Sequence, residues 1–310
     1  MLSVNRIALA IILILLLLVP HIASSYIVYV AVLAILFSML TASYDLLTGY
    51  AGPLSFCHAA FYGFGAYTSA LLALKTGMSF WLALPISGIT VFLFGVMVGY
   101  PALRLRGHYF AVTTFFFGHF MYLVFLNMRA LTRGPLGLGG IPPPDSIFGI
   151  DFSGMTANYY LILVFGILMV GFLYALVNSG FGRLIISVRE NEDLAEAVGV
   201  NTAFVKVMAF SISAGLAGIT GSLFAHFFRL LHPTTFSWMT SEMIVVMALV
   251  GGIGTLVGPI IGAGVVTFML EVMRFAPELR FIIWAIMLIA ILVIEPRGLV
   301  GIYARIRGGR

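Results

Sequence analysis

Long apolar runs, separated by short polar segments, dominate the sequence from end to end. The hydrocarbon core of a bilayer is about 30 Å thick, so about 20 apolar residues in a helix cross it. Helices are expected because backbone groups in lipid must hydrogen-bond within their own segment. The runs predict an all-α membrane protein, a polytopic bundle of about ten transmembrane helices in a single domain over 1–310. The predicted spans are 7–19, 26–44, 54–74, 80–100, 109–126, 159–177, 207–228, 243–253, 257–273 and 281–294.

The composition agrees with a lipid environment. Hydrophobic residues make up 62% of the chain and charged residues 9%, whereas about a quarter of a soluble domain is charged. A soluble fold of this size could not bury so much apolar surface, which excludes a cytosolic enzyme and a disordered regulator. The basic residues are scattered singly between the apolar runs or gathered at the C-terminus, with no basic face that carries interleaved aromatics, so no nucleic-acid partner is expected. The single cysteine, Cys57, excludes an internal disulfide, and no metal site is expected.

Two runs leave alternatives open. Run 7–19 follows Arg6 and precedes Pro20, so it is either a signal peptide or, as we favour, a retained first helix. Run 243–253 is too short to cross unless it begins near Ser237, which would bring Glu242 into the membrane.

The positive charges predict an orientation. With a cytoplasmic N-terminus, ten of the 16 basic residues fall on inner segments and six on outer ones. This distribution follows the positive-inside rule and places both termini in the cytoplasm.

Two clusters rich in glycine, at 49–53 and 251–255, each precede an apolar run, one in each half of the chain. Glycine in membrane helices most often permits tight packing. Broken segments in matching positions of two halves are also typical of an inverted repeat around a central path. We therefore expect residues in and after the clusters to line a translocation path. The candidates are Gly52, Ser55, His58, Gly63, Tyr67, Gly252, Gly254 and Thr255.

Two longer polar regions interrupt the apolar runs. Region 128–158 is rich in glycine and proline and falls on the extracytoplasmic side. A long loop there is a binding surface, a lid or only a slack connection between two helices. Region 178–206 falls in the cytoplasm, and six of the fourteen residues in 183–196 are charged. We expect a short helix over 184–188 and a second one between a cap at Asn191 and a stop at Gly199. The apolar stripe of this second helix, Leu194, Ala197 and Val198, either packs on the bundle or fits a groove of a cytoplasmic partner.

The same region carries a family resemblance. Gly182-Arg183, the segment VRENE at 188–192 and AEAVGVN at 195–201 resemble the cytoplasmic coupling loop of ABC importer permeases, in particular the LivM-type permeases of branched-chain amino acid uptake. Four further blocks are similar to that family in the same order, at 49–67, 103–111, 131–138 and 251–263. The resemblance runs from about Gly49 to about Gly301. The sequence departs from the family pattern at Pro53, Cys57 and Arg133.

The resemblance implies an ABC importer permease fold with cytoplasmic coupling helices, in a bacterial or archaeal cell membrane. It implies a transport subunit rather than an enzyme, forming the path for branched-chain or other hydrophobic amino acids. The implied partners are a solute-binding protein, a second related permease and two ATPase subunits that bind ATP and magnesium, with no cofactor in this chain. The acid that faces the ATPase is then Glu196. The implied coupling residues are Gly182, Arg183, Arg189, Glu190, Asn191, Glu196, Ala197 and Gly199.

Other functions remain open from the residues alone. A P-loop needs Gly-Lys-Ser/Thr, and neither Lys75 nor Lys206 follows a glycine, so we expect no ATP site in this chain. An ion-coupled secondary transporter would place acids within the membrane; Asp45, Glu242 and Glu271 lie at or inside its predicted edges. A channel or a membrane enzyme is a further alternative, and a urea or short-chain amide permease is the alternative within the same family.

Overall fold

The computed structural model describes residues 15–105, 107–147, 149–273, 285–286, 289, 295 and 298–301. Five of its helical segments are long and apolar enough to cross a membrane, which confirms the all-α membrane class. The predicted number of about ten spans stays a prediction, because most of 7–19 and 281–294 lies outside the described residues. The elements are α2 (Ser25–Asp45), η1 (Leu46–Ala51), α3 (His58–Thr76), α4 (Phe80–Ala102), α5 (His108–Asn127), α6 (Arg129–Thr132), η2 (Gly134–Leu136), β1 (Leu138–Gly139), α7 (Met155–Val177), α8 (Gly180–Glu190), α9 (Glu192–Ala197), α10 (Thr202–Phe228), β2 (Leu230–Leu231), η3 (Pro233–Phe236), α11 (Trp238–Gly251) and α12 (Val257–Val272).

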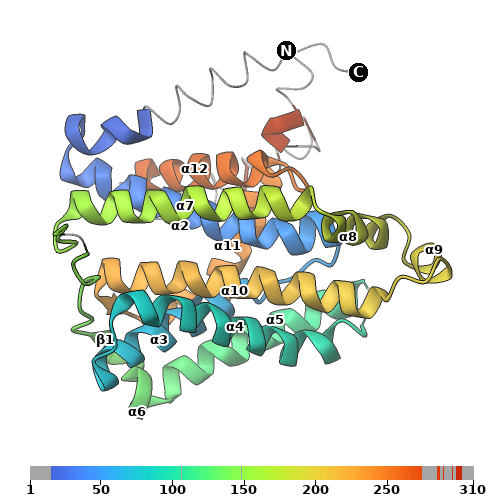
Figure 1. Cartoon of the computed structure of the whole chain (residues 1–310), viewed down its shortest axis with the longest axis horizontal. Coiled ribbons are helices and arrows are strands. Elements are labelled where there is room, and N and C mark those ends of the chain that lie inside the picture. The colour runs from blue at the N-terminus through green and yellow to red at the C-terminus, as the bar shows by residue number, and fades with distance from the viewer. Residues whose placement is uncertain are drawn as a thin grey trace.

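The long helices lie side by side and define two ends of the bundle. The helices α8 and α9 project at one end, which we call the α9 end, and the pair of short strands β1 and β2 lies at the other, which we call the sheet end (Figure 1). Regions 178–206 and 128–158 are therefore at opposite ends, as a position on opposite sides of a membrane requires.

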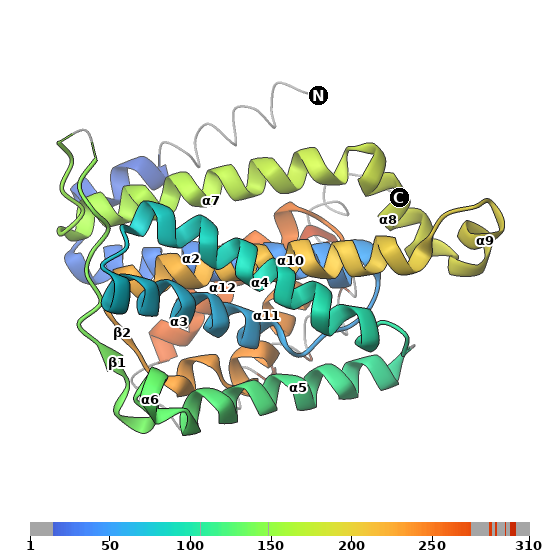
Figure 2. The same cartoon turned by 60° about the horizontal axis from the view of Figure 1, so that its bottom comes forward.

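The helix α10 forms the centre of the bundle. Of its most apolar window 78% is buried, against 28% for α5 and for α7. Figure 2 shows α10 and α2 between α7 on one side and α5 on the other. Glycines permit this packing: a Cβ on Gly65 would overlap the backbone of Gly218, and one on Gly221 would overlap the carbonyl of Tyr62. Tight packing is thus what most glycines in these helices serve.

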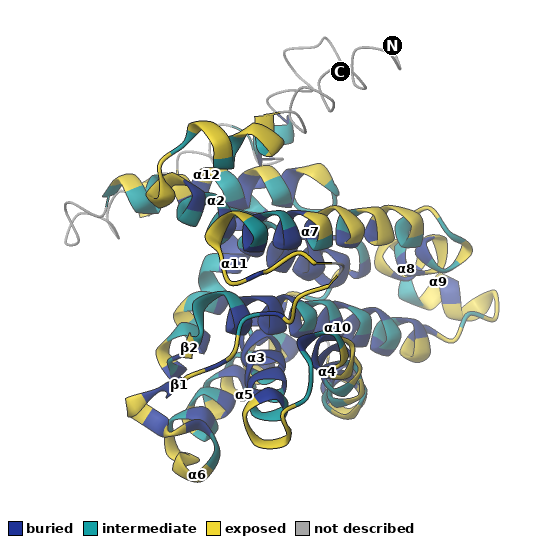
Figure 3. Ribbon diagram, turned by 60° about the vertical axis from the view of Figure 1, so that its left-hand side comes forward, coloured by how far each residue is buried: buried dark blue, intermediate teal, exposed yellow. Residues whose placement is uncertain are grey.

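Each outer helix has one face buried in the core and an opposite face that exposes apolar side chains. Figure 3 shows exposed positions along α7, while α10 is mostly buried. On α4 the exposed side chains recur every three or four residues and so form one stripe. A stripe of this kind faces lipid or another membrane subunit. Its members are Leu82, Ile86, Ile89, Leu93 and Met97.

Three segments are irregular. The helix α2 continues into the π-helix η1, which ends at Gly52 with a positive φ of 100°. The helices α11 and α12 have 14 and 16 residues, about 21 and 24 Å at 1.5 Å per residue, which is shorter than the membrane core. The helix α11 begins at Trp238, so it includes Glu242, as expected for a start near Ser237. Immediately before it, Phe236 is fully buried among Tyr62, Tyr67, Phe125 and Phe224.

Candidate ATPase-coupling site

The two short helices of the α9 end form because side-chain caps begin them. The Ser179 hydroxyl accepts a hydrogen bond from the Gly182 amide (3.2 Å), and Oδ1 of Asn191 accepts one from the Leu194 amide (2.9 Å). Gly199 has a positive φ of 90°, which only glycine adopts freely, and it ends α9. The expected cap at Asn191 and stop at Gly199 are confirmed. The helix α8 is longer than the predicted 184–188, because the cap at Ser179 starts it earlier.

One face of α8 is fixed on the bundle. Ile185 and Val188 are buried, and Gly182 presses against the carbonyls at the end of α7, where a Cβ would overlap Val177 O. Because any side chain at 182 would force α8 away from α7, the position of α8 depends on this glycine. The α8 helix is therefore packed on the ends of the membrane helices and is not a loose loop.

The helix α9 presents its apolar stripe to the outside. The side chains of Leu194 and Val198 are 62% and 73% exposed, and Ala197 is also exposed, whereas Ala195 is buried at 4%. Of the two expectations for the stripe, packing on this chain's own bundle is wrong. The buried side chain of α9 is Ala195, one residue beside the stripe.

Acidic side chains tie α9 to the start of α10. The Lys206 ammonium pairs with Glu192 at 2.5 Å, and the Thr202 hydroxyl donates to Oε1 of Glu196 at 2.6 Å. Oδ1 of Asn201 caps α10 through the Phe204 amide (3.0 Å). A helix as short as α9 is marginal alone in water, so these bonds stabilise it. We call the Glu192–Lys206 and Glu196–Thr202 bonds the α9 brace.

The helix α8 also reaches the two glycine clusters. Arg189 donates from Nη1 to the carbonyl oxygen of Gly49 in η1 (2.5 Å), and its Nη2 pairs with Glu190 (2.8 Å). The Gly254 amide donates to Oδ1 of Asp45, at the end of α2 (2.8 Å). The breaks at 49–53 and 251–255, which lie far apart in the sequence, are therefore in contact, with Arg189 bound beside them.

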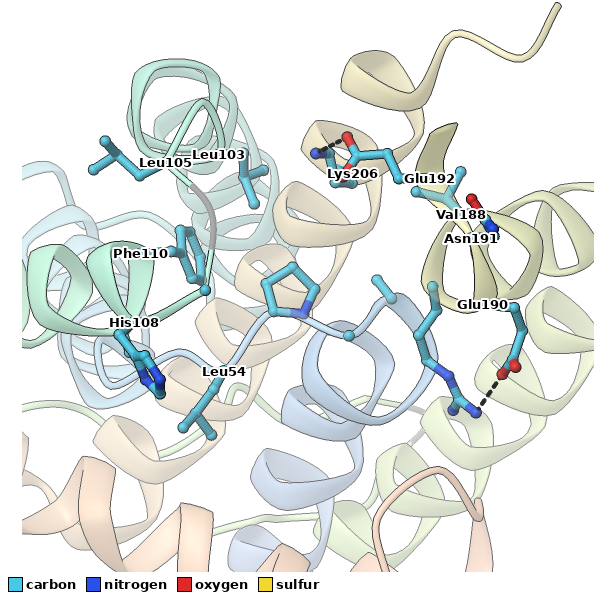
Figure 4. Close-up of a pocket in the computed structure, with 16 residues that line it drawn as sticks. Leu54, Leu103, Leu105, His108, Phe110, Val188, Glu190, Asn191, Glu192 and Lys206 are labelled. Carbon is cyan, nitrogen blue, oxygen red and sulfur yellow. Dashed lines mark hydrogen bonds and ion pairs between the residues drawn. The ribbon is translucent and has the colours of Figure 1, made fainter. Parts of the chain in front are cut away.

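A cavity of about 480 Å³ opens beside this junction. Figure 4 shows Glu190 and Glu192 on one side of it and Leu105, His108 and Phe110 on the other, and the Lys206–Glu192 pair closes one edge. The α4–α5 turn, the 51–54 segment and α8 thus surround one hollow at the α9 end. It is lined by Ala51, Gly52, Pro53, Leu54, Leu103, Leu105, Gly107, His108, Phe110, Ala111, Val188, Arg189, Glu190, Asn191, Glu192 and Lys206.

Comparison with known proteins shows the family of the chain. Residues 26–292 match the family described as branched-chain amino acid transport system / permease component. The chain belongs to this permease family. The high-affinity branched-chain amino acid transport system permease protein LivM of Salmonella typhimurium and that of Escherichia coli are each 29% identical to it, over 90% of this chain and 71% of the relative.

Further relatives include one permease of a different import system and one that carries the same system name as LivM. The autoinducer 2 import system permease protein LsrC of Salmonella typhi is 29% identical over 47% of this chain and 44% of its own length. The branched-chain permease protein LivH of Salmonella typhimurium is 23% identical, over 86% of this chain and 91% of its own length. No solved structure matches. The chain is therefore a multi-pass permease component related to LivM, with a transport rather than an enzymatic role.

The path candidates of this permease fall into separate groups. Gly52 lines the cavity at the α9 end, and Gly252, Gly254 and Thr255 form the neighbouring break, where the Thr255 hydroxyl donates to Gly252 O at 2.8 Å. The others lie deeper and do not join this group. They are Ser55, beside Cys57 (3.3 Å), His58, and the pair Gly63 and Tyr67, which lies in the aromatic cluster around Phe236.

His58 is a packed side chain in this structure. Its Nε2 is hydrogen-bonded to the Ser43 hydroxyl at 2.9 Å, and its ring lies edge-on to Tyr44 at 5.5 Å.

Three residues that take part in this site, Gly49, Thr202 and Lys206, are not among the residues predicted from the sequence. Gly49 was part of a recognised glycine cluster, and Lys206 is one of two lysines in the chain, so both carried a sequence signal. Within the described residues, no group of three His, Cys, Asp or Glu could hold a metal ion.

Proposed function

We propose that this chain is the permease subunit of an ATP-binding-cassette importer that forms the path for branched-chain or other hydrophobic amino acids. A solute-binding protein would deliver the substrate at the sheet end. Two separate ATPase subunits would bind ATP and magnesium, and would dock on α8 and α9. The observation that supports docking is the exposed apolar stripe of Leu194, Ala197 and Val198 on a capped and braced helix.

The physical argument is that an apolar stripe needs cover and a rigid helix can transmit motion. Burying the side chains of Leu194 and Val198 against another surface would lower the free energy, because it removes apolar area from water. An amphipathic helix lying in a hydrophobic groove is a common way to join two proteins. The ATPase would then shift the balance between the inward-open and outward-open permease, by as much as it binds one of them better.

The remaining assignments follow from this role. We propose that the α9 end is cytoplasmic, together with both termini, and that the second permease subunit is a related chain, as the pairing of LivM and LivH names suggests. Glu196 would face the ATPase while its Oε1 holds Thr202. Gly182, Arg183, Arg189, Glu190 and Asn191 would shape the same contact from α8 and the turn.

The test is uptake of labelled leucine in cells that hold a proton gradient, with and without the partner ATPase subunits. ATP-dependent uptake that disappears without the ATPases is expected. Uptake that persists without them would instead establish an ion-coupled secondary transporter or a channel. Competition by urea and acetamide, with leucine as the matched control, separates the amide alternative: only leucine is expected to compete.

A further inference from the structure

A cation from α8 and a carboxylate from α2 meet at the two broken segments. Arg189 binds the Gly49 carbonyl, and Asp45 binds the Gly254 amide. A Cβ on Gly49 would overlap the Asp45 carboxylate, and one on Gly254 would lie 3.3 Å from both Arg189 Nη1 and Gly49 O. The four groups therefore share one small space, and no side chain could be added to either glycine there without displacing a neighbour.

Only one of the two oxygens of the Asp45 carboxylate accepts a hydrogen bond within this group. Asp45 is 1% exposed, and among the described residues its Oδ2 accepts no hydrogen bond. A buried carboxylate without a full set of partners is costly. Arg189 lies close enough to act on Asp45 electrostatically, yet it donates to a neutral carbonyl and to the exposed Glu190. A guanidinium binds a carboxylate more strongly than it binds a carbonyl.

We propose that Arg189 and Asp45 form a two-state latch between the coupling loop and the broken helices. In the state described, Arg189 binds the Gly49 carbonyl; when α8 moves, its guanidinium passes to Oδ2 of Asp45, which accepts no hydrogen bond from the described residues. This inference rests on the proposed function, because an ATPase must supply the movement of α8. Arg189 and Asp45 are thus positioning residues that carry the movement of the loop to α2 and to the α11–α12 break.

The backbone at the junction is suited to two arrangements. The segment η1 is a π-helix, an irregularity found frequently at functional sites. Gly52 and Gly254 have φ values of 100° and 77°, where a residue without a side chain moves at least cost. A guanidinium can therefore exchange acceptors while α2 and α12 keep their own hydrogen bonds.

The test uses the full complex in proteoliposomes, with its ATPase subunits and binding protein, and measures leucine moved per ATP hydrolysed. Coupling between sites typically changes affinities 5- to 150-fold. We expect Arg189→Gln and Asp45→Asn each to lower the ratio about tenfold while ATP hydrolysis continues, and the double variant to be no worse than the more severe single variant. Arg189→Lys keeps the charge but not the fork of donors, and should restore part of the ratio. Arg104→Gln, which removes an exposed arginine stacked on Tyr100, is the matched control and should leave the ratio unchanged.

The outcomes separate the latch from the proposed function. Wild-type complex without ATP-dependent uptake would overturn both. Wild-type uptake together with a normal ratio in Arg189→Gln would overturn the latch alone. Additive losses in the double variant would do the same, because independent structural damage adds whereas loss of one shared contact does not. If Asp45→Asn failed to assemble, the comparison of Arg189→Gln with Arg189→Lys would decide, because Arg189 is partly exposed.

Discussion

The two ends of the bundle differ in which side chains they expose and which they bind within the chain. At the α9 end, charged groups are bound within the chain and the apolar side chains of Leu194 and Val198 face outward. At the sheet end, polar side chains bind the long loop to the helices. Asp145 accepts the Phe80 amide at 2.9 Å, and a ring nitrogen of His226 lies 2.8 Å from Pro142 O. Apolar side chains of α9 are thus left uncovered at one end, whereas hydrogen bonds within the chain fix the loop at the other.

The comparison resolves one of the alternatives for region 128–158. His232 lies 3.0 Å from Pro135 O, and Arg229 donates to Ser153 O at 2.9 Å, so the loop is tied to the β2 side at several points. The Trp81 indole donates to the carbonyl of Asp145 at 3.0 Å. A loop bound in this way is not slack. A binding surface and a lid remain the functions to test, and Leu136, which is 87% exposed, is its most prominent apolar side chain.

The largest effect is expected from charging the exposed stripe. Leu194→Asp combined with Val198→Asp should weaken binding of the ATPase subunits about 30-fold or more, because interface hot spots contribute about 2 kcal/mol or more. The measurement is ATPase co-purification with the permease from detergent. Leu136→Asp at the sheet end, where the leucine is also exposed, is the control and should leave co-purification of the ATPase unchanged. Equal loss in both variants would remove the contrast between the two ends.

An intermediate effect is expected from the α9 brace. Lys206→Met removes the ammonium that pairs with the partly buried Glu192, which should destabilise the permease by about 1–3 kcal/mol. The combination with Glu192→Gln should cost less than the sum of the single changes, because each change removes the same pair. Thermal unfolding in detergent measures both. Strict additivity would show that the pair does not hold α9.

The smallest effect is expected at the sheet end and depends on pH. The hydrogen bond from the Ser79 side chain, together with the Phe80 amide, holds the pKa of the Asp145 carboxyl below its usual value. Its stabilisation is therefore present above about pH 4 and is lost as the pH falls through the lowered pKa. Asp145→Ala, which removes the acceptor of the Phe80 amide, should lower stability at pH 7 by about 1 kcal/mol, as loss of a helix cap does. The difference between variant and wild type should shrink on acidification from pH 5 to pH 3; a constant difference would contradict the assignment.

Local features of the α9 end could be predicted from the sequence, whereas its contacts could not. Asn191, Gly199 and Asn201 act on residues two to four positions away, and capping preferences reveal such effects directly. Arg189 and Gly49 are 140 positions apart and Asp45 and Gly254 are 209 apart, and no periodic pattern records such pairs. The direction of the stripe was open for the same reason, because periodicity identifies a face but not what lies opposite it.

The membrane spans show the same division. The predicted ends of 80–100 and 109–126 agree closely with α4 and α5. The run 54–74 was predicted to begin at Leu54, but α3 begins at His58 because residues 52–57 form a connector from η1. Hydropathy cannot separate a buried apolar connector from a helix, since both exclude water. An apolar run could predict that α11 is short, but it could not predict that the preceding Phe236 is buried in the bundle.

The most direct test of the central claim is a cross-link from α9 in the assembled complex. A photoreactive side chain at position 198 should capture an ATPase subunit, and the yield should change when ATP is bound, whereas the same group at position 136 should not capture it. If position 198 captured only lipid or the binding protein, or reacted with a reagent restricted to the cell exterior, the α9 end would not be the ATPase contact and the account would be wrong.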